Sequence, residues 1–184
     1  MEITKERLKS MWPYTALLLP VAALLIVRLG QVELFALLML EMIIVFGYIA
    51  AIIDLKKKKI PNKLILTMLA AWVLVMTPKL YLDTETAIGL LKDSALGLFF
   101  GGGMFLFVYL ISRKGLGGGD VKFMAAAGLY LGFAGAIQTI LFGTILAALT
   151  GLSLILLKKL GRKDTLPLAP FLFAGILAAA FFGG

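Results

Sequence analysis

The chain has 184 residues, of which 61% are hydrophobic and only 15% are charged, and its mean hydropathy is +1.04. A water-soluble domain of this size is not so apolar, so the composition indicates an integral membrane protein. Because one span takes roughly 20 apolar residues, the length of the chain allows about seven spans and no separate soluble domain. The formal charge of +8 falls in short clusters between apolar runs, which membrane topology explains better than nucleic-acid binding does.

Cysteine and histidine are both absent from the sequence. Their absence excludes disulfides, zinc sites of the usual ligand type, thiol nucleophiles and the common base at neutral pH. Hydrolytic chemistry in this chain would therefore depend on carboxylates, hydroxyls or lysine.

Apolar runs follow one another along the chain and predict an all-α, polytopic bundle of about seven transmembrane helices. The first run follows a basic N-terminus, as in a signal peptide, but it is longer than a signal core and no small-residue cleavage site follows, so we expect a retained span. Gly132 and Gly135 mark a tight turn between the fifth and sixth spans. The expected spans are residues 11–29, 34–53, 62–78, 94–112, 120–134, 136–157 and 166–183.

The basic residues predict the orientation of these spans. With the N-terminus inside, 15 of the 18 basic residues fall in inner segments, and only Arg28, Lys79 and Lys92 fall outside. The positive-inside rule therefore favours seven spans with the N-terminus inside and the C-terminus outside.

Asp54 ends the second span, two residues before a run of four lysines. It could simply mark the water boundary. Two points favour a specific role: the helix dipole opposes a carboxylate at a helix C-terminus, and the lysines already mark that boundary.

Asp120 opens the fifth span, directly after Gly117, Gly118 and Gly119. It could be an ordinary N-cap, whose carboxylate accepts backbone N–H groups. Three glycines suggest more, because they allow positive φ and close approach of another chain segment. A phosphate cradle is the weaker alternative, since the second glycine and lysine of a P-loop are missing.

Asp54 and Asp120 are expected at the same face and at similar depth. Two close carboxylates share one proton, so that one acts as a base and the other as an acid. The ionised member would activate water, while the protonated member would polarise a peptide carbonyl and then assist the leaving amine. The pair titrates as a unit, so neither role is assigned to one residue.

Three other charged residues, Asp164, Glu41 and Lys122, are expected to have less specific roles than the two aspartates. Asp164 lies in a basic loop, where a solvated or capping role is expected. Glu41 lies on the same helix as Asp54, roughly 20 Å away along the axis and on another face, so it would pack helices or pair with Lys92. Lys122 is expected to contact a lipid phosphate, with tuning of the aspartates or substrate binding as the alternative.

Two further sequence features concern the membrane. The run from Lys56 to Lys59 is expected to orient the chain and to contact anionic lipid head groups. Gly101 to Gly103 are expected to permit close helix contact, with a hinge as the lesser option.

Two motifs resemble those of the type IV prepilin peptidases, which are GxGD-type membrane aspartic proteases. They are Asp54 separated by six residues from Pro61-Asn62, and Gly117-Gly118-Gly119-Asp120-Val121-Lys122. Each motif is short, but the two occur in order, each at the cytoplasmic end of a span. The segment Leu166 to Phe171 also looks like the last helix of this family, so the likeness covers roughly residues 34 to 184.

The resemblance implies an endopeptidase of the inner membrane with its active site at the cytoplasmic face. Its substrates would be precursors of type IV pilins, pseudopilins or related filament and secretion subunits, cut after a short basic leader. It implies Asp54 and Asp120 as the catalytic pair, with Gly117, Gly118, Gly119, Lys122 and Pro61 supporting the active-site loop. It implies no metal and no cofactor for proteolysis.

The chain also departs from long members of that family. They carry a cytoplasmic insert with paired CxxC motifs, which this sequence lacks. We expect residues 1–33 to form a cytoplasmic tail and an extra transmembrane helix, and residues 34–184 to form the six-helix peptidase core. Long members also methylate the new N-terminus with S-adenosylmethionine; no methyl-donor site is evident here, so methylation stays open.

Three other classes fit the sequence less well. A proton-coupled transporter would place acids near the midplane in two matching halves. A structural subunit of a secretion complex would have degenerate motifs, yet both aspartates are present. A metal-dependent phosphotransferase would need more clustered carboxylates.

Overall fold

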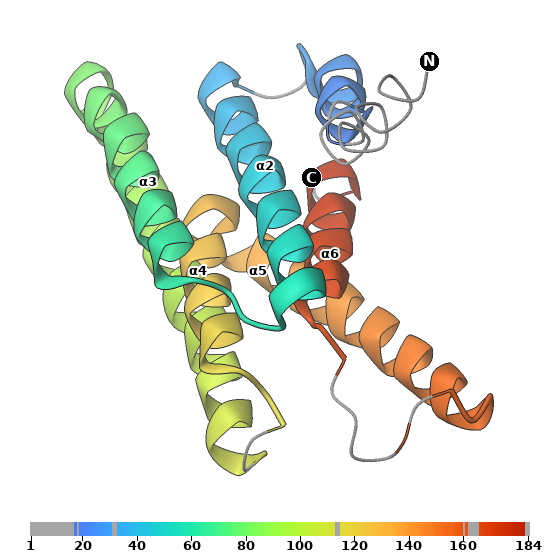
Figure 1. The fold of residues 1–184 in the computed structure, drawn as a ribbon. Helices are drawn as coiled ribbons and strands as arrows, with labels where there is room; N and C mark the ends of the chain where they lie inside the picture. Colours follow the sequence, from blue (N-terminus) through green and yellow to red (C-terminus); the bar gives the residue numbers. More distant parts are fainter. Residues whose placement is uncertain are drawn as a thin grey trace, which may run out of the picture.

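A computed structural model describes residues 17, 19–30, 33–112, 115–159, 161 and 166–182, and its ordered elements are all helical. Four of its helices are long and apolar enough to cross a membrane, which confirms the expected membrane helix bundle (Figure 1). Residues 1–16, expected to hold the tail and the start of the first span, lie outside the described part. The helices are α2 (Leu34–Lys57), α3 (Asn62–Leu82), α4 (Thr84–Ile111), α5 (Gly118–Leu156) and α6 (Ala169–Phe182), preceded by the shorter helix Leu19–Arg28.

The fifth and sixth predicted spans are joined in α5, which breaks at Gly132. This glycine has φ 67° and ψ −173°, a conformation outside the helical region that residues with a side chain rarely adopt. The two halves of α5 point in different directions in Figure 1. The predicted turn is therefore confirmed at Gly132, whereas Gly135 lies within the second helical half and makes no turn.

A carboxylate from α4 supports this break. Asp93 Oδ1 accepts the backbone N–H of Phe133, the first residue after the break, at 3.1 Å. A Cβ at Gly132 would overlap the same carboxylate. Asp93 thus acts as an N-cap supplied from a neighbouring helix, which satisfies one of the free N–H groups at the start of the second half of α5.

Glycines bring α4 and the first half of α5 into backbone contact. A Cβ at Gly97 would lie 2.6 Å from the carbonyl oxygen of Gly132, and one at Gly101 would lie 2.8 Å from that of Met124. A Cβ at Gly102 would lie 2.7 Å from Cβ of Ala125, whereas Gly103 has nothing within 4 Å. The expected close contact is confirmed for Gly101 and Gly102 and is wrong for Gly103, which points away from α5.

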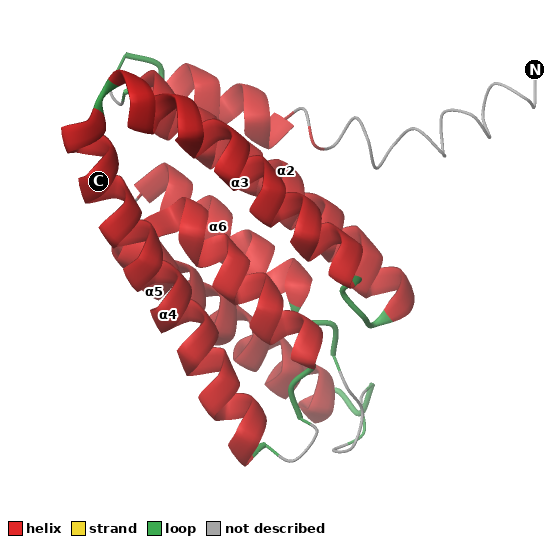
Figure 2. Ribbon diagram, turned by 90° about the vertical axis from the view of Figure 1, so that its left-hand side faces the viewer, coloured by secondary structure: helices red, strands yellow, loops and turns green. Residues whose placement is uncertain are grey.

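The second half of α5 and helix α2 both pack on α6. A Cβ at Gly143 would lie 3.0 Å from the carbonyl oxygen of Phe171, and one at Gly47 would lie 3.0 Å from the ring of Phe173. Helix α6 runs antiparallel to α2 in Figure 1, and Figure 2 shows the helices of the bundle from the side. The start of α6 therefore lies beside the end of α2, at the lysine-rich end of the bundle.

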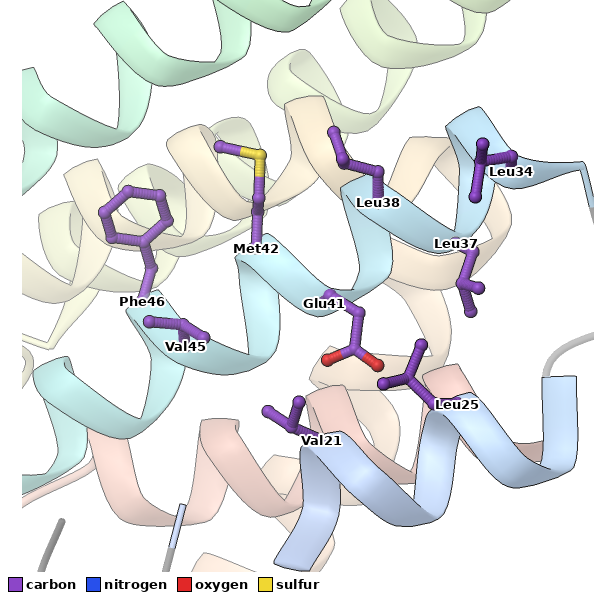
Figure 3. Close-up of a pocket in the computed structure, with 9 residues that line it drawn as sticks. All are labelled: Val21, Leu25, Leu34, Leu37, Leu38, Glu41, Met42, Val45 and Phe46. Atoms are coloured by element: carbon purple, nitrogen blue, oxygen red, sulfur yellow. The ribbon is translucent and has the colours of Figure 1, made fainter. Parts of the chain in front are cut away.

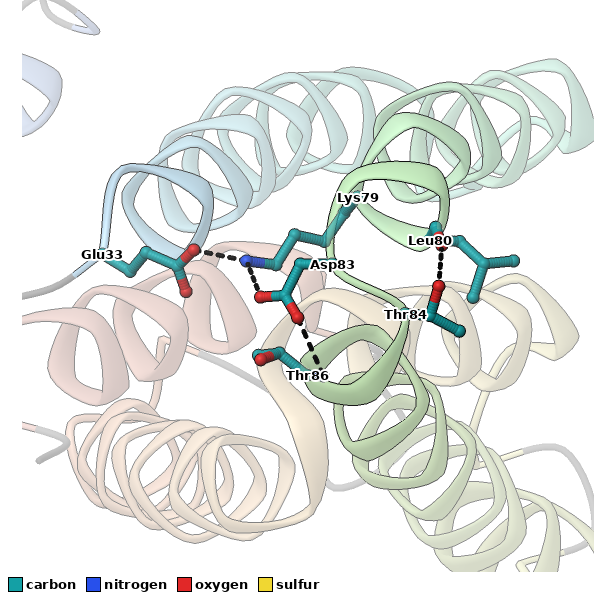
Figure 4. A network of polar contacts seen from close by, with 6 residues as sticks. All are labelled: Glu33, Lys79, Leu80, Asp83, Thr84 and Thr86. Atoms are coloured by element: carbon teal, nitrogen blue, oxygen red, sulfur yellow. Dashed lines mark hydrogen bonds and ion pairs between the residues drawn. The ribbon is translucent and has the colours of Figure 1, made fainter.

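At the opposite end, ion pairs join three chain segments (Figure 4). Lys79 of α3 pairs with Glu33 before α2 and, at 3.2 Å, with Asp83. Asp83 also accepts the N–H of Thr86 at 3.3 Å and so caps α4. The hydrogen bond from Thr86 and the contact with Lys79 hold the pKa of the Asp83 carboxyl below its usual value.

This cap corrects one predicted boundary. We expected the fourth span to begin at residue 94, but α4 begins at Thr84, directly after Asp83. The residues between 84 and 93 are polar enough to suggest a loop, yet an aspartate cap with Glu85 in the first turn starts a helix ahead of the apolar run.

The helix Leu19–Arg28 lies against the end of α6. Arg28 donates from Nε to the carbonyl of Ala180 at 3.1 Å and from Nη2 to that of Phe181 at 3.2 Å. A cation at a helix C-terminus satisfies free carbonyl groups and complements the dipole. The division of the chain between residues 33 and 34 stays a prediction.

The contact between α4 and α5 leads to a stability prediction. Gly97→Ala should lower the free energy of unfolding by about 1–3 kcal/mol, because the new methyl group has no room against the α5 backbone. Thermal unfolding in detergent micelles measures it. Gly103→Ala makes the same chemical change on the same helix in open space and should not lower the unfolding temperature; equal losses in the two variants would contradict this account of the packing.

Candidate functional site

Asp54 and Asp120 line one cavity of about 350 Å³ at the lysine-rich end of the bundle. The two aspartates come from α2 and α5, and their carboxylates lie within electrostatic range of each other. The structure thus brings together the two residues that the sequence singled out, and we call this space the dyad cavity. Its walls are Asp54, Lys58, Lys59, Ile60, Asn62, Gly117, Gly118, Gly119 and Asp120.

Asp54 lies in the last turn of α2 rather than at its end. The helix continues to Lys57, and Lys58 then adopts the left-handed conformation with φ 49° and donates its N–H to the carbonyl of Asp54 at 2.7 Å. The Asp54 side chain is only 5% exposed. Its Oδ2 accepts the backbone N–H of Ala169, the first residue of α6, at 3.0 Å.

This hydrogen bond explains how a carboxylate is tolerated at the end of α2. The dipole of α2 opposes a negative charge there, but the start of α6 presents free N–H groups and a positive dipole end to the same carboxylate. Sequence reasoning missed Ala169, because the donor is a backbone group more than a hundred residues away.

Asp120 lies in the first turn of α5. Its Oδ2 accepts the N–H of Gly117 at 3.2 Å, as a capping carboxylate does. Its Oδ1 is buried and has no hydrogen-bond partner in the described chain. A buried carboxylate oxygen without a partner costs about 1–3 kcal/mol, so the oxygen is available for a proton shared with Asp54, a water molecule or a ligand.

Both carboxylates therefore lie at helix N-termini, Asp120 at that of α5 and Asp54 at that of α6. Each is held through one oxygen by a backbone N–H. This arrangement limits rotation of both side chains, so that the chemistry of the pair does not depend on flexible partners.

The three glycines before Asp120 serve different purposes. A Cβ at Gly119 would lie 3.2 Å from the carbonyl oxygen of Ile60 and 3.3 Å from its nitrogen, so this glycine admits the loop between α2 and α3. A Cβ at Gly117 would meet the Asp120 carboxylate itself, and Gly118 faces open space. Close approach of another chain segment is confirmed at Gly119 alone, and none of the three has positive φ.

The remaining predicted loop residues lie next to the dyad cavity. Lys122 donates from Nζ to Oδ1 of Asn62 at 3.1 Å. Pro61 precedes α3 in an extended conformation and lines a neighbouring cavity of about 410 Å³ with Ile53, Lys57, Lys59, Ile60 and Asn62. Neither Lys122 nor Pro61 lines the dyad cavity itself.

Glu41 lies elsewhere, in an apolar groove of about 500 Å³ between the helix Leu19–Arg28 and α2 (Figure 3). Its carboxylate points toward Val21 and Leu25, and neither oxygen has a hydrogen-bond partner in the described chain. Pairing with Lys92 is wrong, because α2 and α4 are not in contact. Its separation from the aspartate pair is confirmed.

Within the described ranges, no three Asp, Glu, His or Cys side chains come together to hold a metal ion. Asp164 lies outside the described residues, so its expected capping role stays a prediction.

Comparisons with known proteins agree on one family. The family described as "Type IV leader peptidase family" matches residues 41–152, a range that contains both aspartates. The chain is similar to proteins named "Prepilin leader peptidase/N-methyltransferase". It is 29% identical to that of Bacillus subtilis (strain 168) over 73% of the chain and 52% of the relative, and 32% identical to that of Burkholderia pseudomallei (strain 1026b) over 75% and 46%.

A third relative covers more of the chain. The protein of that name from Aeromonas hydrophila is 29% identical over 88% of the chain and 54% of the relative. The chain thus spans about half the length of the curated relatives that it matches. No solved structure matches it significantly.

The approach of Gly119 to Ile60 can be tested directly. Gly119→Ala should displace the loop that follows α2, because its methyl group would lie 3.2 Å from Ile60 O and 3.3 Å from Ile60 N, which is closer than a Cβ normally approaches backbone atoms. We expect trypsin to cut the Lys56 to Lys59 run several-fold faster in this variant, as measured on membrane vesicles open on that side. Gly118→Ala is the control, since its methyl group enters open space; equal cutting rates in the two variants would refute the contact.

Proposed function

The chain belongs to the type IV leader peptidase family, and we propose that it is an aspartic endopeptidase of the membrane that removes the short basic leader from type IV prepilins or related filament and secretion subunits. The observation that carries this proposal is the dyad cavity, in which Asp54 and Asp120 meet. Two carboxylates that share a proton provide a base and an acid without histidine or metal.

The proposed reaction uses water as the nucleophile. The ionised carboxylate takes a proton from water as its oxygen attacks the carbonyl carbon of the scissile peptide. The protonated carboxyl group donates to the carbonyl oxygen, which gives a neutral tetrahedral diol. Collapse of this diol breaks the C–N bond as the protonated carboxyl group gives its proton to the leaving nitrogen and the ionised one takes a proton from a hydroxyl of the diol. The new carboxylic acid and amine leave, and the pair again holds one proton.

The position of the cavity suits such a substrate. It lies at the end of the bundle with the Lys56 to Lys59 run, which the positive-inside rule assigns to the cytoplasm. We place the active site at the cytoplasmic face of the inner membrane. A substrate with an apolar helix after its leader would remain in the bilayer and dock laterally against the spans, with its cleavage site at the head-group level.

The leader is not drawn in by charge attraction to the protein surface, because both are basic. Lys58 and Lys59 line the dyad cavity beside the two carboxylates. We propose that the exposed lysines of this run contact anionic lipid head groups, so that binding of the leader depends on its backbone and on the apolar helix after it.

We propose that proteolysis requires no cofactor. The relatives' name includes an N-methyltransferase, which would need a methyl donor such as S-adenosylmethionine. The described residues around the dyad cavity and its neighbour include no aromatic side chain on which an adenine could stack, and the larger groove is apolar apart from Glu41. These surroundings do not fit that cofactor, so the proposal is limited to proteolysis.

The catalytic roles can be tested with variants that keep the local hydrogen bonds. In Asp54→Asn and Asp120→Asn, the amide oxygen still accepts the N–H of Ala169 or Gly117. Each variant should lose at least about 100-fold in the rate of prepilin cleavage, because the acid–base pair is broken. A gel-shift assay of a co-expressed prepilin measures the rate, with immunoblotting of the membrane fraction for the amount of enzyme.

Asp93→Asn is the matched control. It makes the same substitution on a membrane helix outside the dyad cavity and still accepts the N–H of Phe133. We expect it to cleave at the parental rate. Parental activity in Asp54→Asn and Asp120→Asn would rule out the two-aspartate mechanism.

A further inference from the structure

Asn62, the first residue of α3, lies where two cavities meet. It lines the dyad cavity and also the neighbouring cavity of about 410 Å³. The neighbouring cavity adds the apolar side chains of Ile53 and Pro61. A peptide chain that extended from the aspartates into this second cavity would pass the Asn62 side chain.

Lys122 determines which end of the Asn62 amide faces that path. Its ammonium group donates to Oδ1 at 3.1 Å. An ammonium group has three donors and no acceptor, so it can pair only with the oxygen of the amide. The orientation of an asparagine amide, which is otherwise ambiguous, is therefore set here by chemistry.

Both N–H donors of Asn62 remain available, because no residue in the described chain accepts a hydrogen bond from them. The adjacent cation draws charge toward the amide oxygen and makes these N–H groups stronger donors. The walls of the dyad cavity otherwise carry the carboxyl groups of the aspartate pair and two exposed lysines. Asn62 is the neutral side-chain donor among the residues that line this cavity, and Lys122 holds its amide.

We infer that Asn62 donates a hydrogen bond to a backbone carbonyl of the substrate beside the scissile peptide. Lys122 is then a positioning residue that keeps the amide in the donor orientation. A peptide bound in extended form needs donors for its carbonyl groups, and besides Asn62 the side-chain donors of the second cavity are the two exposed lysines Lys57 and Lys59. The inference rests on the proposed peptidase function.

Cleavage kinetics on a purified prepilin in detergent or vesicles test the donor. Asn62→Leu keeps the size of the side chain and removes the donor, so kcat/KM should fall about 5- to 100-fold. The fall should appear mainly as a higher KM, because the hydrogen bond forms in both the bound substrate and the transition state. If Asn62→Leu does not fold, Asn62→Asp replaces it, since it keeps the acceptor for Lys122.

The role of Lys122 is tested by a double-mutant cycle. Lys122→Met should lower kcat/KM by a smaller factor than Asn62→Leu, Lys122→Arg should restore it, and Lys122→Met should have no further effect in the N62L background. Lys63→Met removes a lysine that lines neither cavity and should leave cleavage unchanged.

Parental kcat/KM in Asn62→Leu would overturn the inference while the proposed function stands. An equal effect of Lys122→Met in both backgrounds, or one that disappears without anionic lipid, would show that Lys122 contacts lipid and does not position Asn62. If the parental protein leaves the precursor uncut, the proposed function itself fails, and this inference fails with it.

Discussion

Backbone contact at glycine is the constraint on which the site depends. Asp120 is carried by α5, which meets α4 at Gly97 and Gly101 with no side chain between the two backbones. Helix α6 meets the second half of α5 at Gly143 in the same way. Inside a bilayer no hydrophobic force drives helices together, so close van der Waals contact sets their positions. The aspartates are brought together by helices that can approach only because these residues lack side chains.

The break at Gly132 links this packing to the dyad cavity. It lets one apolar segment leave the lysine-rich end with Asp120 and return toward that end to support α6. Helix α6 in turn presents the N–H of Ala169 to Asp54. The Asp93 cap at the break and the two aspartates at the lysine-rich end therefore belong to one continuous framework, although the two regions lie at different depths in the bundle.

Both carboxylates of the site are held at helix ends. Asp54 accepts the N–H of Ala169 at the start of α6, and Asp120 accepts that of Gly117 at the start of α5. A strong cationic partner would keep both carboxylates ionised and prevent them from sharing a proton. Backbone N–H groups hold the two side chains in place without a full positive charge, which is compatible with one protonated and one ionised carboxyl group in the same cavity.

The sequence by itself determined the class of protein, the order of the helical segments, the break at Gly132 and the approach of Asp54 and Asp120 to each other. Composition, apolar run length, charge distribution and short motifs are local properties, and each follows from how a residue partitions between water and lipid. Tertiary structure alone decided that α4 starts at Thr84 and that Gly103 makes no contact. It also decided that Glu41 faces a groove away from Lys92, that Ala169 donates to Asp54 and that Asn62 lines the dyad cavity. These features depend on which helix faces meet across long sequence separations, and an apolar helix in a membrane shows little in its sequence about which face is buried against protein and which against lipid.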